Sequence, residues 1–404
     1  MKAIYWIRND LRLHDNAALS LFCEQASEGV AVWCTSASFR RAGDRRKSFI
    51  LQSVEEFASK LRMQGVPVIV ANKCASELLP ELASQLKIER IFVTEECSPE
   101  EMAEEAMVAE YREHFLTRVE QAALLRKEDL PFSISETPEV FTQFRLQVEK
   151  SLLVRDILPK PQRWPKAIKI PSLESIESSP LTATHPKISP GESAGLARVA
   201  EYIWERDRLR VYKETRNGML HWDDSSKFSP WLSVGALSPR EIYREIQRYE
   251  SERCKNESTY WLFFELLWRD YFRFILEKKQ ASVFGRRPPL DERAIADFAR
   301  WCNAETGDDF IDANMAELNS TGWLSNRGRQ NVASYLAKEV NVPWQYGAEY
   351  FERMLLDYDV ASNWGNWAYL AGVGQDPRNR KFNSARQAEI YDPEGEYRRK
   401  WLAR

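Results

Sequence analysis

The sequence predicts an α/β domain with a doubly wound parallel sheet, followed by an all-α domain. Up to about residue 119, short apolar runs alternate with amphipathic stretches, the pattern of strands connected by helices. Beyond residue 195 the apolar residues recur with helical spacing instead. A length of 404 residues supports two domains, because single hydrophobic cores stop growing near ~250–300 residues.

The first domain is expected to span residues 1–130. Its buried strands are predicted by the apolar runs at 3–7, 30–34, 66–71 and 90–95. Helices are expected between them, near 16–27, 45–64, 76–87 and 99–114. No GxGxxG motif follows the first strand, so the common dinucleotide fingerprint is absent. Asp15 or Asn16 is expected to cap the first helix.

Residues 131–194 are expected to connect the domains, because 171–195 are rich in Ser, Pro and Thr and show little periodicity. The all-α domain is expected at 195–404, and its first helix has apolar residues at 196, 199, 200, 203 and 204. Further helices are expected at 239–250, 256–278, 292–303, 311–319, 326–339 and 346–356.

The composition favours a cytoplasmic protein without a metal site. The net charge is −3, so any contact with nucleic acid would need a local basic patch. The six cysteines show no CxxC spacing and only four histidines are present, which indicates reduced structural thiols. The N-terminal residues MKAIYWIRND lack an apolar signal core, and no run approaches the ~20 apolar residues that cross a bilayer.

Polar and aromatic side chains are concentrated between residues 357 and 383. The stretch DYDVASNWGNWAY combines two acids with amide and indole groups, a set suited to the wall of a pocket for an aromatic cofactor. The alternative is a core-forming turn followed by a buried helix. Eleven of the 14 tryptophans lie beyond residue 200, which favours a stacking or photochemical role for that half.

Several segments in order closely resemble the photolyase/cryptochrome family. They are TRNGMLHWDDSSKFSPWLSVGALSPR (215–240), STYWLFFELLWRDYFRF (258–274), LNSTGWLSNRGRQNVASYL (318–336) and DYDVASNWGNWAYLAGVGQDPRNRKFN (357–383), with IYWIRNDLRLHDNAAL (4–19) and EVFTQFR (139–145) in the first half. The segments VGQDPRN, SNWGNW and SNRGRQ are most similar to those of DASH-type cryptochromes. The resemblance implies the photolyase/cryptochrome architecture, an antenna domain followed by an all-α FAD-binding domain.

The resemblance implies that FAD is bound by the all-α domain. The matching positions are Tyr212, Ser225, Ser226, Lys227, Phe228, Ser229, Arg269, Asp357, Tyr358, Asp359 and Asn363. Their chemistry agrees, because hydroxyl and backbone N–H groups of SSKFS can bind pyrophosphate oxygens and Lys227 adds a positive charge. Taken alone, SSKFS could equally be a helix N-cap. Asn363 matches the residue that faces flavin N5.

Two tryptophans match the family's electron-transfer chain. Trp367 and Trp344 match its inner members, whereas the third member should lie near residue 291, where the sequence reads PPLDERAIA. Trp301 or a nearby tyrosine could replace it, or photoreduction could be slow. The alternative is that Trp344 and Trp367 only fill the core.

The resemblance also implies a pocket for a flipped-out cyclobutane pyrimidine dimer, made by Glu265, Trp268 and Asn326. Gln330 stands where duplex-repairing photolyases have Met, and Tyr369 stands where they have Trp, as in DASH proteins. A smaller aromatic recovers less stacking energy, so lesions in single strands should be favoured. SNRGRQ contains no His, which argues against repair of the six-four photoproduct.

Contacts to DNA are expected from a local group of basic and polar residues. They are Arg216, Arg327, Gln330, Tyr369, Arg380 and Gln387, with Arg329, Arg378 and Lys381 nearby. The alternative for each arginine is a solvated surface position. Glu95 matches the acid that binds a folate antenna, although an exposed acid at a strand end explains it as well.

The predicted function is therefore light-driven repair of cyclobutane pyrimidine dimers, chiefly in single-stranded DNA, by a monomer that carries FAD and could carry a folate. The main alternative is a DASH-type blue-light receptor that binds nucleic acid or a partner without repair, and a third is an electron-transfer flavoprotein without a light role. The chain ends three residues after Trp401, which argues against signalling through a long C-terminal tail.

Overall fold

A six-stranded parallel sheet forms the middle of the first domain. The computed structural model describes residues 1–112, 114–170, 185–374 and 381–402. Within them the strand order is β3-β2-β1-β4-β5, with β6 beside β2, and every strand pair is parallel, which confirms the predicted sheet. The strands are β1 (Lys2–Ile7), β2 (Glu28–Cys34), β3 (Val68–Ala71), β4 (Arg90–Thr94), β5 (Leu116–Val119) and β6 (Lys166–Ala167).

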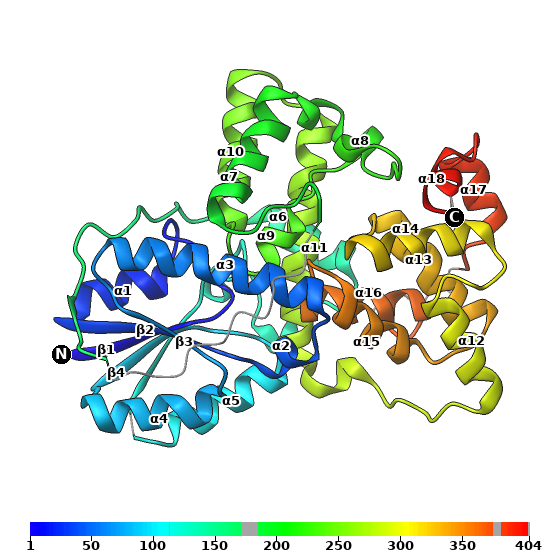
Figure 1. The fold of residues 1–404 in the computed structure, drawn as a ribbon. Helices are drawn as coiled ribbons and strands as arrows, with labels where there is room; N and C mark the ends of the chain where they lie inside the picture. The colour runs from blue at the N-terminus through cyan, green and yellow to red at the C-terminus, as the bar shows by residue number, and fades with distance from the viewer. Residues whose placement is uncertain (113, 171–184, 375–380, 403–404) are drawn as a thin grey trace.

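Helices cover both faces of this sheet (Figure 1). α1 (Ala17–Gln25) and α3 (Asp44–Met63) lie on one face, and α4 (Ala75–Leu86) and α5 (Pro99–Ala109) lie on the other. Alternate side chains of β1 point to opposite faces of the sheet. Tyr5 packs in the core on the side of α1 and α3, and Trp6 packs in the core on the side of α4. The short α2 (Ala37–Arg41) follows β2.

Of the two predicted caps, Asn16 starts α1 by accepting a hydrogen bond from Leu19 N at 3.0 Å. Asp15 instead forms an ion pair of 2.8 Å with Arg240 of the second domain. Asp270 of the second domain accepts hydrogen bonds from Leu124 N and Leu125 N of the first. These buried contacts hold the two domains together.

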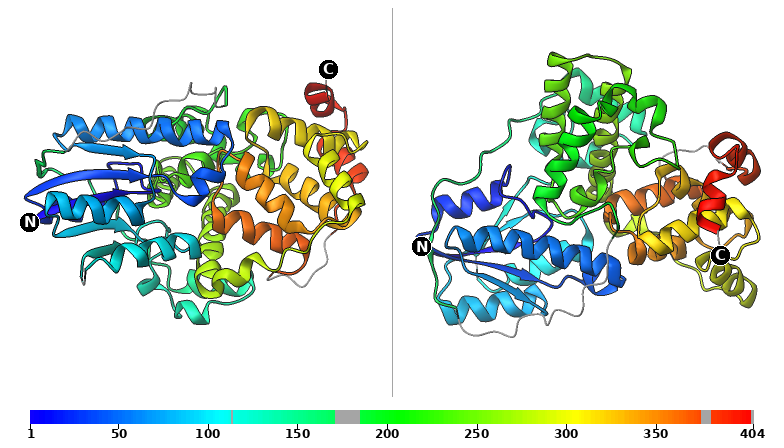
Figure 2. Two further views of the ribbon diagram at one scale, coloured as in Figure 1. Left: turned by 60° about the horizontal axis from the view of Figure 1, so that its bottom comes forward. Right: turned by 45° about the horizontal axis from the view of Figure 1, so that its top comes forward.

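The second domain is helical throughout its described residues (Figure 2). Its helices are α7 (Glu192–Ala200), α8 (Tyr212–Thr215), α9 (Ser229–Ser233), α10 (Pro239–Glu252), α11 (Glu257–Lys279), α12 (Glu292–Cys302), α13 (Asp309–Thr321), α14 (Asn326–Ser334), α15 (Trp344–Met354), α16 (Val360–Ala371), α17 (Ser384–Tyr391) and α18 (Glu396–Leu402). Single π-helical turns extend α7 and α14. The long, largely buried α11 packs against α8, α10 and α16 and so forms the centre of the domain.

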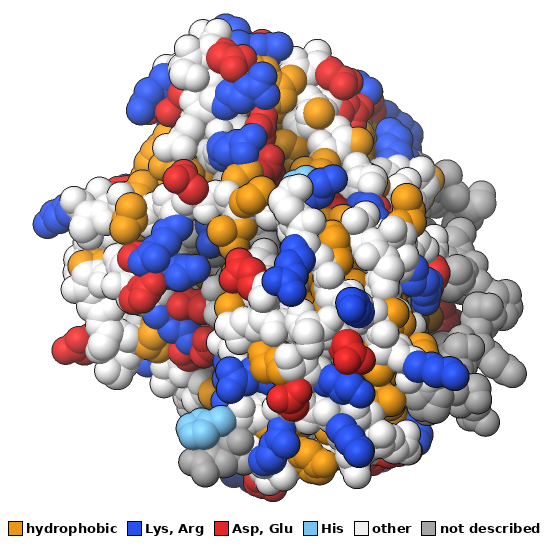
Figure 3. Space-filling view, turned by 90° about the vertical axis from the view of Figure 1, so that its left-hand side faces the viewer, with side chains coloured by type: hydrophobic (Ala, Val, Ile, Leu, Met, Phe, Trp, Pro, Cys, Tyr) orange, Lys and Arg blue, Asp and Glu red, His pale blue; other side chains and the backbone are white. Residues whose placement is uncertain are grey.

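Between the domains, α6 (Phe141–Lys150) packs on α11. No described helix is long and apolar enough to cross a membrane, and the described residues contain no cluster of metal-ligating side chains. Lys and Arg side chains are mixed with Asp and Glu over the face of the molecule that carries the first domain (Figure 3).

Candidate functional site

A deep hollow opens in the second domain between α11, α14, α16 and the stretch 225–229. Its empty space, open mouth included, is about 1370 Å³. All the predicted cofactor-binding residues line it, from Tyr212 and Ser225 to Asp359 and Asn363. Residues separated by more than 100 positions in the sequence are thereby brought to one cavity.

α11 supplies one wall of the hollow. The helix begins at the Asn256 cap, whose side chain accepts hydrogen bonds from Ser258 N at 2.9 Å and Thr259 N at 3.0 Å. Leu262, Glu265, Leu266 and Arg269 then line the hollow. Their spacing of three and four residues places them on one face of the helix.

Lys227 places a positive charge in the opposite wall. Its backbone is in the left-handed region, with φ of 60°. Its Nζ donates to Ser225 Oγ at 2.9 Å and lies 3.9 Å from the ring centroid of Trp323. Burial lowers the pKa of Lys227 to about 7, although the carboxylates of Glu317 and Asp224 oppose the shift. A buried amino group of this kind fits the pyrophosphate of a dinucleotide.

Asp357 is held in the wall by two neighbours. Arg329 Nη2 donates to both carboxylate oxygens at 2.9 and 2.8 Å, and Ser229 Oγ donates at 2.6 Å. Arg329, expected near the DNA contacts, is thus engaged by Asp357 and lines the cavity. The sequence did place Arg329 close to Asn326 and Gln330, but it could not show which face of α14 the side chain takes.

Asp359 provides a carboxylate at the start of α16. It caps the helix by accepting from Ser362 N at 2.7 Å. Burial alone would raise the pKa of Asp359, but the guanidinium groups of Arg269 and Arg273 lower it below the ordinary value. Asp359 thus stays ionised and can accept hydrogen bonds from N–H groups of a ligand. Four residues after Asp359, Asn363 also lines this cavity, and its Nδ2 donates to Ala348 O at 3.0 Å.

The predicted lesion pocket continues the same hollow. Glu265, Asn326 and Gln330 line it, and Glu265 forms an ion pair with Arg216. Burial raises the pKa of Glu265, while Arg216 opposes that shift. Gln330 Oε1 is buried and has no hydrogen-bond partner among the described residues. An unpaired buried acceptor of this kind suits a ligand that brings an N–H donor.

Two aromatic rings form a corner beside α11. The rings of Trp268 and Tyr369 are 6.0 Å apart at 77°. Phe141 of α6 stacks on Trp268 at 3.7 Å and 14°, which fixes the plane of the indole. Phe141 lies in the EVFTQFR segment that carried the resemblance, but only the structure shows its contact with Trp268.

The predicted DNA contacts are only partly free to meet phosphates. Arg216 is paired with Glu265. Arg327 donates to Asn217 Oδ1 at 3.3 Å and lies 4.6 Å from the ring centroid of Tyr391. Gln387 lies on α17, near the start of that helix, and Arg380 and Arg378 lie outside the described residues.

The two predicted electron-transfer residues lie in one hydrophobic core with two further tryptophans. The ring centroid of Trp367 is 5.1 Å from Phe351 and 6.3 Å from Trp301. Trp344 lies 5.6 Å from Trp364. The prediction did not assign Trp364 a role, although it stands one helical turn before Trp367. Asp291, in the stretch where the third tryptophan was expected, caps α12 by accepting from Ala294 N at 2.8 Å.

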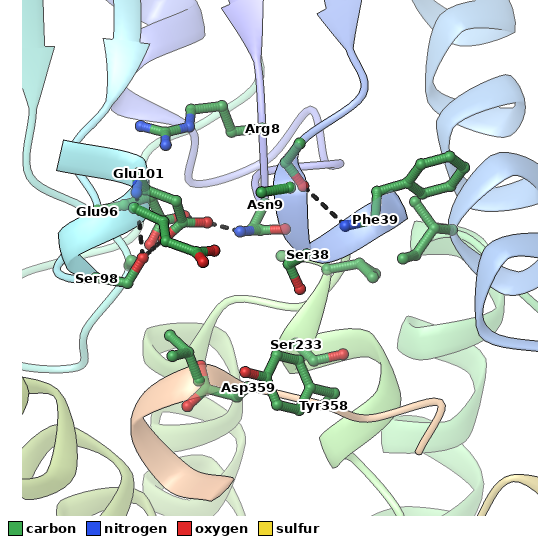
Figure 4. Close-up of a pocket in the computed structure, with 18 of the residues that line it drawn as sticks. Arg8, Asn9, Ser38, Phe39, Glu96, Ser98, Glu101, Ser233, Tyr358 and Asp359 are labelled. Carbon is green, nitrogen blue, oxygen red and sulfur yellow. Dashed lines mark hydrogen bonds between the residues drawn. The ribbon is translucent and has the colours of Figure 1, made fainter. Parts of the chain in front are cut away.

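A second hollow lies between the two domains, at the carboxyl ends of β1 and β2, and holds about 1570 Å³ of empty space (Figure 4). Asn9 donates to Glu96 across it at 3.1 Å, while Tyr358 and Asp359 face it from the second domain. Burial and the neighbouring carboxylate of Glu96 raise the pKa of Glu101 to about 7. Tyr358 and Asp359 line both hollows, so only a thin wall separates them.

The predicted antenna residue Glu95 lies elsewhere. Its carboxylate pairs with Lys127 at 2.7 Å, and Lys127 also pairs with Glu277. The hollow beside it is much smaller than the other two, with about 300 Å³ of empty space, open mouth included. A folate could reach this carboxylate only after Lys127 moves, so the folate prediction receives no support from the geometry.

The fold and the first hollow define a two-domain protein whose helical domain encloses a cavity suited to a dinucleotide cofactor. The family model described as the FAD binding domain of DNA photolyase matches residues 261–404, and the model described as DNA photolyase matches residues 3–166. Cryptochrome DASH from Synechocystis sp. is 41% identical over 430 residues, covering 99% of this chain and 87% of that protein.

Solved structures agree with this result. The crystal structure of Synechocystis cryptochrome has a TM-score of 0.93 and 40% identity and covers 100% of this chain and 88% of that one. The Sulfolobus tokodaii photolyase, described with two FAD molecules, has a TM-score of 0.81 and 26% identity, with coverage of 100% and 90%. The chain belongs to the photolyase/cryptochrome family, where it is most like the DASH cryptochromes, and it contains the family's FAD-binding domain.

Proposed function

We propose that this protein splits cyclobutane pyrimidine dimers, chiefly in single-stranded DNA, in a light-driven reaction. One observation carries the proposal: the cavity that suits FAD runs on into the group Glu265, Asn326 and Gln330. A base held by that group would lie in the same enclosure as the flavin. When bound, reduced FAD supplies the electron that light drives onto the dimer.

The residues of this pocket have complementary roles. Burial raises the pKa of Glu265 and Arg216 opposes that shift, so a dimer bound in place of Arg216 would leave a carboxyl that takes up a proton more readily and can donate a hydrogen bond to a pyrimidine carbonyl. Gln330 Oε1 can accept from a pyrimidine N–H, which would satisfy its unpaired oxygen. Trp268 and Tyr369 offer two ring faces at a corner, against which the two joined bases can pack.

The preference for single strands follows from an energy balance. Flipping a dimer from a duplex costs a few kcal/mol, and stacking returns about 1–3 kcal/mol per base. Tyr369 offers a smaller surface than an indole. Arg216 and Arg327 are already engaged by Glu265 and Tyr391, which reduces the free positive charge available for duplex phosphates. A lesion that is already unstacked avoids the largest cost.

The test compares one dimer-bearing thymine oligonucleotide as a single strand and in a duplex, each mixed with reduced protein. Under blue or near-ultraviolet light, thymine absorbance should recover faster in the single strand than in the duplex. Samples kept dark should not recover. If light restores neither substrate although the protein binds the DNA, the repair proposal fails, and the alternative of a blue-light receptor without repair takes its place.

We also propose that the interdomain hollow holds a second light-absorbing cofactor. Ligands of open parallel sheets bind at the carboxyl ends of the strands, and this hollow lies there. The Sulfolobus tokodaii photolyase is described with two FAD molecules and with the implication of a novel light-harvesting cofactor. The absorption spectrum of the purified protein should then show more chromophore than one FAD per chain. A spectrum of a single FAD would contradict this.

A further inference from the structure

A third hollow lies beside Trp344, on the other side of α16 from the flavin cavity. It holds about 900 Å³ of empty space, mouth included. Ala361, Gly365 and Ala368 of α16 line it, whereas Asn363 and Trp367 of the same helix line the flavin cavity. Ala361 and Ala368 extend no further than Cβ into this space, whereas the ring of Phe272 packs against Gly365. Helix α16 therefore lies between the two hollows.

The polar groups of this hollow point to a ligand. Gln345, which is 6% exposed, lines it. Its Nε2 donates to Arg286 O at 2.9 Å, but its Oε1 is buried and finds no hydrogen-bond partner among the described residues. Leaving a buried acceptor unpaired is costly, so a ligand O–H or N–H group would be favoured there.

The charge around the hollow favours an anion. Arg286 and Lys279 both line it. Lys279 is paired with Glu139 at 2.6 Å. Arg286 is exposed and forms no ion pair within the described part of the chain. A small molecule with one negative charge and a hydroxyl or N–H donor would therefore complement both Arg286 and Gln345.

The indole of Trp344 gives this hollow a chemical role. Trp344 is 8% exposed and lines it. Asp291, in the stretch where the third tryptophan was expected, is a helix cap and cannot donate an electron. Trp301 is the tryptophan in ring contact with Trp367, but it is fully buried and its Nε1 donates to Val332 O. A molecule from solution can thus approach Trp344 and cannot approach Trp301.

We propose that this hollow binds a small anionic reductant of the ene-diol type, such as ascorbate, which delivers an electron to Trp344. The inference rests on the proposed light-driven function. Trp367 passes one electron to oxidised FAD in the light, Trp344 refills Trp367, and the bound reductant refills Trp344. The reductant loses one electron and releases one proton to water. The reductant thereby replaces the missing third tryptophan.

The first test measures binding in the dark. Ascorbate is titrated into the FAD-loaded protein by calorimetry, and one site is expected. Gln345→Leu and Arg286→Gln should each raise the dissociation constant for ascorbate by roughly tenfold. This is the effect of losing one charged or buried hydrogen bond. Arg293→Gln, at a 92% exposed side chain on α12, removes the same charge away from the hollow and should change nothing. Circular dichroism checks that each variant is folded.

The second test measures photoreduction of the oxidised protein as ascorbate is increased. The rate should saturate for the wild type and for Arg293→Gln, and should need roughly tenfold more ascorbate in the two hollow variants. With dithiothreitol, which is neutral, the rate should rise linearly and be the same in all four proteins. Trp344→Phe should abolish reduction by either donor, whereas Trp301→Phe should not.

Two results would overturn the inference. One is a linear dependence on ascorbate that the hollow variants leave unchanged, together with no binding in the dark. The other is loss of photoreduction in Trp301→Phe but not in Trp344→Phe, because electrons would then enter elsewhere. If the wild type shows no photoreduction with either donor, the electron route itself fails and this inference falls with it.

Discussion

The buried amino group of Lys227 predicts that Lys227→Met stabilises the FAD-free protein and weakens its hold on FAD. Burial lowers the pKa of Lys227 to about 7, whereas an unfolded lysine has a pKa of ~10.4. At 1.36 kcal/mol per pKa unit the charged side chain costs the folded state up to about 5 kcal/mol. Relaxation of the surroundings should reduce this to about 2–3 kcal/mol.

The pH dependence of this cost has a definite sign. The folded pKa lies below the unfolded one, so between pH ~7 and ~10.4 the unfolded chain binds more protons. The cost is therefore fully present below pH 7 and disappears as the pH rises towards 10.4. Wild-type FAD-free protein should gain stability over that interval, and Lys227→Met should lack that part of the gain.

Urea unfolding of FAD-free protein at pH 6.5, 8 and 9.5 measures the difference. Lys227→Met should be more stable than wild type by about 2 kcal/mol at pH 6.5 and similar to it near pH 10. Its affinity for FAD should fall by roughly 10- to 100-fold, because a charge-assisted contact to the pyrophosphate is lost. Lys255→Met, at a 78% exposed side chain, serves as the control. A variant less stable than wild type at pH 6.5 would refute the reasoning.

Three further substitutions test the rest of the site. Trp367→Phe should slow photoreduction of oxidised FAD at least tenfold while chemically reduced protein still repairs dimers; loss of both activities would mean that Trp367 is only structural. Glu265→Ala should lower the repair yield with FAD still bound, as measured by dimers split per absorbed photon, and an unchanged yield would remove Glu265 from the mechanism. Asp357→Asn should weaken FAD binding by about 1–3 kcal/mol, because Arg329 loses its carboxylate inside the cavity wall; FAD retention equal to wild type during gel filtration would contradict this.

The buried strands could be predicted from the sequence because each is a nearly continuous apolar run. The runs at 3–7, 30–34 and 90–95 became β1, β2 and β4 almost residue for residue. β5 was missed because its residues, LTRV, are half-exposed at the sheet edge and carry no such run. The predicted helix at 99–114 ends at Ala109, and His114 has a positive φ of 55°.

The residue types of the site could also be predicted, but their partners could not. Resemblance supplied Glu265 and Arg216 separately, and only the fold shows that the two form an ion pair. In the same way Glu95 is bound by Lys127, which lies 32 positions away. Such pairings depend on how loops and helices pack, so they cannot be predicted from local sequence patterns.

The most direct test of the central claim counts dimers split by each reduced protein molecule, without oxygen and without added reductant, during illumination of a dimer-bearing single strand. Because the electron is expected to return after each ring opening, many dimers per molecule should be split. A yield that stops at one dimer per molecule, or none at all, would contradict light-driven repair at this cavity.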